Sequence, residues 1–275
     1  MKKITILLSA TVLCSCSVNR MAVKSVSGII DRGMGAVFSE KDLAYSRQAI
    51  PANLKLMEIL LETQEDERLL LNASLGFCGY AWAFLDESSP SQAAAFYRKG
   101  IDYSSRLMKK QKLFKNSELV ESRLNSKNAG ALFWNTFCKS ALINLDPSDS
   151  ENSIMLGETE RQAMLLAQKH PDYFHNSVYA ILGSIYASKP TIMGGDILKA
   201  RTFFEKSFEK DGAAFLLNKY MYARTYAVAT QDEKLFSDTL EEIIFSPQKS
   251  SDCAFFDAVA REKASLLKEK KNDYF

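Results

Sequence analysis

Apolar residues recur every three or four positions along most of this chain of 275 residues. This spacing places apolar side chains on one face of an α-helix, so it predicts helices instead of strands. The predicted helices are residues 50–62, 69–86, 90–112, 128–145, 151–169, 175–188, 196–210, 214–230, 232–245 and 252–269. No segment convincingly shows the alternation of apolar and polar residues that is typical of a strand. The sequence therefore predicts an all-α protein.

Two distant stretches share the same spacing of small and aromatic residues. They are Leu75-Gly76 with Ala93, Tyr97 and Gly100, and Leu182-Gly183 with Ala200, Phe204 and Ser207. In the tetratricopeptide consensus, small residues at these places let two antiparallel helices approach closely. Both stretches separate the two helices by about five residues more than that consensus does. The sequence therefore predicts a tetratricopeptide-like array of antiparallel helix pairs with lengthened connections.

The second lengthened connection carries the most specific motif of the chain. It lies within Lys189-Pro-Thr-Ile-Met-Gly-Gly-Asp-Ile-Leu-Lys-Ala-Arg-Thr-Phe-Phe-Glu-Lys-Ser-Phe208. This phrase closely resembles the T component (TatT) lipoprotein family of tripartite ATP-independent periplasmic (TRAP) transporters. Members of that family carry a similar proline, double glycine and aspartate before an Ala-x3-Phe helix. Ala49-Ile50-Pro51 and Ala131-Leu132-Phe133-Trp134 are also similar to helices of the family, so the resemblance spans about residues 24–246.

The first residues have the pattern of an export signal. Lys2 and Lys3 precede an apolar run, residues 4–13, that is too short to span a membrane. Leu13 and Ser15 stand three residues and one residue before Cys16, which is the pattern that lipoprotein signal peptidase reads. We expect residues 1–15 to be a lipoprotein signal peptide, Cys16 to be the site of lipid attachment, and residues 16–23 to be a short tether. The alternative is an ordinary signal with incidental cysteines.

Acylation at Cys16 would hold the chain at a membrane. Two or three acyl chains, such as palmitate, each contribute about 0.8 kcal/mol per buried methylene, which is enough for stable anchoring. Ser17, instead of aspartate, follows Cys16, and this favours the outer membrane over the cell membrane. In either membrane the folded part would face the periplasm.

The rest of the chain is balanced in charge and undivided by linkers. Without Lys2 and Lys3, 33 basic residues stand against 33 acidic ones. A nucleic-acid ligand would require a basic face, so this balance argues against one. No Gly/Ser-rich or Pro-rich linker interrupts residues 24–275, and we predict one all-helical domain there.

Few residues could build a catalytic or metal centre. His170 and His175 are the two histidines of the chain, and they do not form a metal-binding motif. Gly194-Gly195 before a helix could cradle a phosphate, but Asp196 occupies the place of the anion. We therefore predict no enzyme, no metal and no cofactor. Gly194, Gly195 and Asp196 are interpreted as a structural loop, in which Asp196 caps the next helix.

Three further cysteines lie in apolar helical stretches. Cys78, Cys138 and Cys253 are odd in number and contain no closely spaced pair, which favours buried free thiols. A Cys78–Cys138 bridge is the alternative, and it depends on a Cα separation that the sequence does not reveal.

Aromatic residues crowd several predicted helices, and residues 69–85 are apolar around nearly the whole helix. Such a helix is either packed on all sides or lines a cavity. The family resemblance implies a helical body around an apolar pore. On that basis Phe77, Tyr80, Trp134 and Tyr186 are candidates for the cavity wall, although ordinary packing explains each one alone.

The resemblance also implies a function and partners. The chain would be the lipid-anchored T component of a TRAP-type transport system, binding the solute-binding protein and a fatty-acid-like, hydrophobic ligand. It would also assemble as a homotrimer. The alternative is a tetratricopeptide-like scaffold lipoprotein of envelope assembly that binds no ligand.

Overall fold

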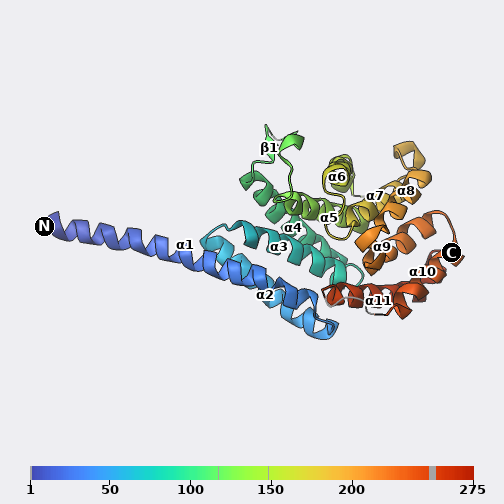
Figure 1. Cartoon of the computed structure of the whole chain (residues 1–275), viewed down its shortest axis with the longest axis horizontal. Coiled ribbons are helices and arrows are strands. Elements are labelled where there is room, and N and C mark those ends of the chain that lie inside the picture. Colours follow the sequence, from blue (N-terminus) through green and yellow to red (C-terminus); the bar gives the residue numbers. More distant parts are fainter. Residues whose placement is uncertain (1, 117, 148, 248–251) are drawn as a thin grey trace.

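Helices follow one another along nearly the whole chain (Figure 1). The computed structural model describes all residues except 1, 117, 148 and 248–251, and it does not describe the side chains of residues 2–17 and 153. The helices are α1 (Lys2–Phe38), α2 (Leu43–Thr63), α3 (Glu67–Tyr80), α4 (Pro90–Lys110), α5 (Ala129–Leu145), α6 (Ser150–Lys169), α7 (Ser177–Ser188), α8 (Ile197–Ser207), α9 (Leu216–Met221), α10 (Glu233–Phe245) and α11 (Ala254–Glu269). The prediction of an all-α protein is confirmed.

Shorter elements connect or extend these helices. The π-helices η1 (Ala81–Leu85) and η5 (Tyr222–Ala227) continue α3 and α9. The 3-10 turns are η2 (Glu121–Arg123), η3 (Thr191–Met193), η4 (Lys210–Ala214) and η6 (Lys271–Asp273). Strands β1 (Phe114–Lys115) and β2 (Glu118–Leu119) pair antiparallel in a short hairpin that the sequence pattern did not predict.

Helix α1 projects away from the body at its start and packs on it at its end (Figure 1). Val23, at the end of the segment expected to be a tether, is already buried. Further along α1, Asp31 accepts a hydrogen bond of 3.3 Å from the Asn72 side chain on α3. The predicted lipid attachment at Cys16 concerns a side chain outside the described residues. None of the helices in the described part of the chain combines the length and the hydropathy of a membrane span.

From α3 to α8, each helix packs mainly on the helices before and after it in the chain. The α7–α8 pair is especially close, because Gly183 leaves room for the ring of Phe204. A Cβ atom at Gly183 would lie 2.6 Å from that ring, and Ala200 and Phe204 are fully buried. The helix pair therefore has the close approach that small residues permit. The tetratricopeptide-like arrangement of the array as a whole stays a prediction.

Helix α11 closes the fold by returning to its beginning. It packs on α9 and α10, and it also contacts α1 and α2 (Figure 1). Arg47 of α2 pairs with Glu262 of α11 at 3.0 Å. Segments far apart in the sequence therefore lie side by side at this end of the molecule.

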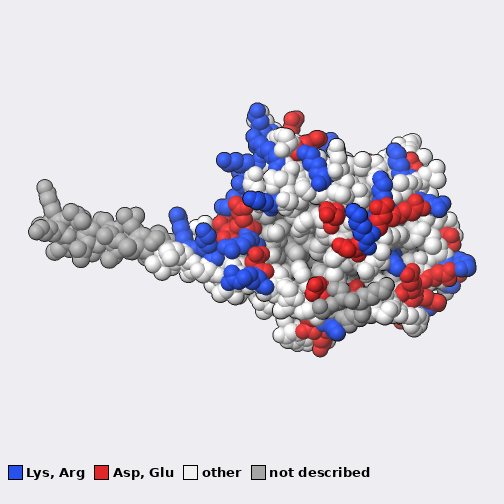
Figure 2. Space-filling view, in the orientation of Figure 1, with Lys and Arg blue, Asp and Glu red and all other residues white. Residues whose placement is uncertain are grey.

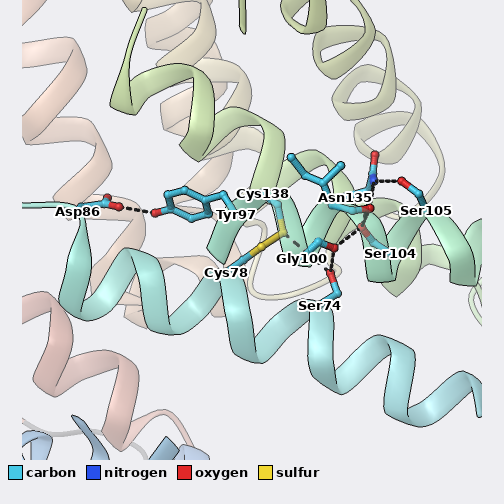
Figure 3. Close-up of a disulfide and its surroundings, with 10 residues drawn as sticks. Ser74, Cys78, Asp86, Tyr97, Gly100, Ser104, Ser105, Asn135 and Cys138 are labelled. Carbon is cyan, nitrogen blue, oxygen red and sulfur yellow. Dashed lines mark hydrogen bonds between the residues drawn. A yellow bond between two sulfur atoms is a disulfide. The ribbon is translucent and has the colours of Figure 1, made fainter. Parts of the chain in front are cut away.

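A disulfide joins Cys78 on α3 to Cys138 on α5 (Figure 3). The two Cα atoms lie 5.6 Å apart. The preferred interpretation of buried free thiols was wrong for these two residues. Gly100 on the intervening α4 explains the close approach, since a Cβ atom there would lie 2.1 Å from the Cys78 sulfur. Cys253 remains a free thiol and is partly exposed instead of buried.

Lys and Arg side chains gather on the surface near the hairpin (Figure 2). Lys109 and Lys110 end α4, where positive charge interacts favourably with the helix dipole. Lys112 and Lys115 lie beyond the helix and are exposed. This end of the molecule is therefore strongly basic although the chain as a whole is nearly neutral.

Candidate functional site

An apolar groove of about 310 Å³ opens between α1, α2, α3 and α11. Its walls are almost entirely hydrophobic and include Ile30, Val37, Leu54, Met57, Leu75 and Phe256. Ile29 and Leu56 also line the groove, and they expose 62% and 44% of their surface to solvent. Large apolar side chains at the rim of an open groove are typical of a binding site for an apolar molecule.

A smaller cavity of about 40 Å³ lies directly behind the floor of this groove. Gly79, Trp134, Phe255 and Phe256 line both spaces, so they form the partition between them. The inner cavity has room for about two or three water molecules, but its exposed wall is entirely apolar, so it should stay dry. The groove therefore continues toward the aromatic core of the protein.

Gly79 is the residue of this partition that has no side chain. It lies within the helical run formed by α3 and η1, where a glycine costs about 1 kcal/mol relative to alanine. A Cβ atom at Gly79 would meet nothing within 4 Å, whereas one at Gly76 would lie 2.5 Å from Leu54. A side chain at position 76 would therefore force Leu54 to shift, whereas a Cβ atom at position 79, which lines both cavities, meets open space.

The structure brings together two of the four predicted cavity residues. Tyr80 lines the groove, and its hydroxyl donates a hydrogen bond of 3.1 Å to the backbone oxygen of Arg47. Trp134 lines the groove and the inner cavity. The role of these residues in ligand binding stays a prediction.

Phe77 and Tyr186 lie outside both cavities. Phe77 points toward α4, where its ring lies 5.2 Å from that of Phe96. Tyr186 lies on α7 and donates a hydrogen bond of 2.6 Å to Glu160. Both side chains therefore pack between neighbouring helices, away from the groove.

Helix α1 supplies a wall that the sequence analysis missed. Its groove-lining residues include Ile30, Met34 and Phe38, which recur at a spacing of four. That spacing is typical of an α-helix, so the sequence pattern could have predicted this part of α1. The contributions of Phe255 and Phe256 could not, because nothing in the local pattern shows that α11 returns to α1 and α2.

The Gly194–Asp196 loop has a local structural role between α7 and α8. Gly194 has a φ of 88°, which favours glycine, and a Cβ atom at Gly195 would lie 1.9 Å from the Lys189 oxygen. The Asp196 side chain accepts a hydrogen bond of 3.0 Å from the Lys199 backbone and caps α8. Ile192 in the preceding turn η3 and Leu198 in α8 are largely exposed.

Cys253 and His175 form a contact between a thiol and an imidazole, which could in principle act as a catalytic pair. The thiol sulfur lies 3.4 Å from His175 Nε2. Burial raises the pKa of Cys253 and lowers the pKa of His175, so both groups are neutral near pH 7. A thiolate paired with an imidazolium is therefore not favoured here. No group of three potential ligand side chains in the described part of the chain is placed to hold a metal ion.

The fold and the groove define an all-α protein with an open apolar cavity. Residues 39–275 match the model of the TRAP transporter T-component family, and the chain belongs to that family. Members of this family are components of transport systems and not enzymes. Family membership therefore associates the chain with a TRAP transport system and with the periplasmic side of a membrane.

The chain is also similar to an uncharacterised protein of Treponema pallidum (strain Nichols). The two are 23% identical over 312 aligned positions, which cover 97% of this chain and 95% of the relative. The relative therefore matches this chain over almost its full length, including the part before residue 39.

Proposed function

We propose that this T component holds the apolar part of a fatty-acid-like molecule in its groove. The observation that carries the proposal is the open groove of about 310 Å³ with hydrophobic walls, which continues toward an inner apolar cavity. Burying roughly six methylene groups there would contribute about 5 kcal/mol before the cost of ordering the ligand. Because that cost offsets part of the gain, binding would be weak and reversible, which a component of a transport system requires.

Three further features belong to the same proposal. Acyl chains on Cys16 would anchor the protein, and the solute-binding protein of the transporter would be its partner. The protein would also be a homotrimer, which sedimentation analysis of the purified chain can measure directly. Transfer of the ligand would be non-covalent, so it would require no catalytic residue.

Native mass spectrometry with solvent extraction tests ligand binding. The purified protein should carry an apolar small molecule that organic solvent removes. A protein that is always empty, and that takes up no dansylamino-undecanoate after extraction, would support the alternative of a scaffold lipoprotein.

Anchoring is tested by replacing the two cysteines at the signal region in turn. Cys16→Ser should move the protein from the membrane fraction to the soluble fraction and remove the acyl mass. Cys14→Ser is the matched control and should leave the protein at the membrane. If Cys14→Ser and not Cys16→Ser releases the protein, the lipid is attached to the other residue.

The partner is tested first from the genome and then by binding. Neighbouring reading frames should encode a solute-binding protein and a permease with several membrane spans. The purified solute-binding protein should bind this chain in a sedimentation experiment. Absence of both reading frames from the same transcript would remove the main support for the transport partner.

A further inference from the structure

A basic segment begins at the end of α4 and runs through the hairpin toward α5. Residues 109–127 contain six basic residues against two acidic ones, whereas the whole chain has 35 against 33. All six basic side chains are exposed. They are Lys109, Lys110, Lys112, Lys115, Arg123 and Lys127. A chain with nearly balanced charge therefore carries a local excess of positive charge on this surface.

The first four lysines of this segment, which we call the basic surface, are not used by the fold. The ammonium groups of Lys109, Lys110, Lys112 and Lys115 form no ion pair and no hydrogen bond with any residue that the structure describes. Arg123 differs, because it donates hydrogen bonds of 2.7 and 3.3 Å to the backbone oxygens of Lys112 and Phe114. Arg123 therefore holds the hairpin, while the four lysines extend into solvent.

The backbone around the basic surface is held in one position. Leu113 is fully buried, and its oxygen accepts a hydrogen bond of 2.8 Å from the Val120 backbone. Lys112 has a φ of 57°, a backbone conformation that favours glycine at the end of a helix. Local folding therefore does not explain why a lysine occupies position 112, and its charge requires another reason.

The carboxylates at this end of the molecule leave most of the positive charge uncompensated. Glu65 pairs with Arg106 at 2.7 Å, and Asp66 pairs with Arg68 at 3.4 Å. Glu62 is exposed in the last turn of α2. The paired carboxylates neutralise arginines of α4 and α3, so they do not neutralise the basic surface.

The basic surface lies at the end of the body from which α1 projects (Figure 1). Gln111, at the end of α4, donates a hydrogen bond of 3.0 Å to Glu67 at the start of α3. The neighbouring Arg68 donates one of 3.3 Å to the backbone oxygen of Lys24 on α1. The start of α3 therefore connects the basic surface to α1, and Figure 2 shows Lys and Arg side chains over both parts.

The described start of α1 combines basic and apolar side chains. Arg20 and Lys24 are exposed, and Val18 and Met21 expose 60% and 69% of their surface. Basic residues beside exposed apolar residues are typical of a helix that lies at a membrane interface. This part of α1 and the basic surface therefore present the same kind of chemistry at one end of the molecule.

We propose that the basic surface lies against the headgroups of an anionic phospholipid membrane. Lysine carries a compact charge on a flexible stem, which suits mobile headgroups, whereas a fixed anion site favours the planar guanidinium of arginine. At physiological ionic strength charges act over about 8 Å, so the lysines need not enter the bilayer. The proposal goes beyond the proposed function, and it depends on the proposed anchor at Cys16 only for the orientation of the body.

The test uses the full chain with Cys16→Ser, so that no acyl chain at this residue contributes to binding. Cosedimentation gives its partition into vesicles of phosphatidylcholine and into vesicles of an equal mixture of phosphatidylcholine and phosphatidylglycerol. Partition should favour the anionic vesicles by at least about tenfold. About 1 M salt should abolish this preference, because it shortens the screening length to about 3 Å. Equal partition, or a preference that salt does not reduce, would overturn the proposal and leave the anchor at Cys16 untouched.

Two variants with the same change in net charge connect the binding to the basic surface. The combination of Lys109→Gln, Lys110→Gln, Lys112→Gln and Lys115→Gln should lower partition into anionic vesicles by at least about tenfold, with no change for neutral vesicles. The control replaces four exposed lysines of α8, η4 and α10, at the other end of the body (Figure 1), and should change partition by less than about twofold. These lysines are Lys199, Lys206, Lys210 and Lys234. Equal losses in the two variants would show that only the overall charge matters, which would refute the proposal.

Two further variants protect the test against misfolding and against a different partner. Lys112→Gln with Lys115→Gln leaves α4 unchanged, and it decides if circular dichroism shows that the fourfold variant is unfolded. It should lower partition into anionic vesicles by at least about threefold. Replacing the four lysines with arginine should preserve this partition, since the charge is kept, and a loss would contradict the proposal. If the glutamine variant binds anionic vesicles normally but loses binding to the purified solute-binding protein, the partner is an acidic protein and the membrane proposal is wrong.

Discussion

Gly79 offers the sharpest test of the groove, because it can be changed without a clash. A side chain at this position would point into the open space between the groove and the inner cavity, where a Cβ atom meets nothing within 4 Å. Gly79→Ala should therefore be accommodated in the folded protein. Gly79→Leu should in addition place an isobutyl group in the partition and obstruct the path from the groove to the core.

The expected magnitude follows from the helical position of the residue. Replacing a helical glycine with alanine stabilises a protein by about 1 kcal/mol where the side chain fits. For a chain of this size, that change should raise the unfolding temperature by about 2–4 °C. In a packed site the added methyl group would clash with its neighbours, so a decrease in stability would show that the open space is absent.

Binding of dansylamino-undecanoate, followed by fluorescence, measures the functional consequence. Gly79→Leu should weaken binding by about tenfold, which corresponds to roughly two methylene groups displaced from the apolar wall. Gly157→Leu is the matched control, since Gly157 is an exposed helical glycine whose Cβ would also meet nothing within 4 Å. If the two leucine variants bind the probe equally, the groove is not the site of the apolar ligand.

Three further predictions concern stability. Cys138→Ala removes the disulfide and should lower the free energy of unfolding by about 4 kcal/mol, because the bridge closes a loop with a sequence separation of 60. Cys253→Ser is the control and should change that free energy by less than about 0.5 kcal/mol. Urea titrations measure both values. Asp196→Ala should cost about 1 kcal/mol in the same assay through loss of the α8 cap, and Asp196→Asn, which can still accept the hydrogen bond, should cost less. Burial acts to raise the pKa of Glu160, but hydrogen bonds from Lys189 and Tyr186 lower it overall, so its stabilising contribution is present above about pH 4.5 and lost as the pH falls further. Glu160→Gln should therefore show a smaller loss of stability than the wild type between pH 5 and pH 3 in acid titrations, and an identical loss would contradict this account.

The helices could be predicted because their apolar spacing is a local property. The predicted helices at residues 128–145 and 232–245 end at the same residues as α5 and α10. The hairpin of β1 and β2 could not be predicted, since strands of two residues are too short to show an alternation. The end of α1 carries the helical spacing at Ile30, Met34 and Phe38, so its omission was an error of interpretation and not a limit of the sequence.

The groove and the disulfide depend on distances that local patterns do not contain. Phe77 and Tyr80 are less than one turn apart on α3, yet Phe77 packs on α4 and Tyr80 lines the groove. Their spacing shows that both are buried but not which neighbour buries them. The Cys78–Cys138 bridge likewise depends on Gly100 of the helix between them, which permits the close approach of the two sulfur atoms.

The position of the disulfide determines which helices around the groove can move apart to admit a bulky ligand. Cys78 directly precedes Gly79, and Cys138 lies about one turn beyond Trp134, so the crosslink fastens α3 to α5 beside the groove floor. Helices α1 and α2 face that floor, and apart from the backbone connection between α2 and α3 they are held against it by packing contacts. If the groove binds the proposed ligand, the ligand would therefore enter by outward displacement of α1 and α2, and a force on α1 from the proposed lipid anchor at Cys16 would weaken ligand binding.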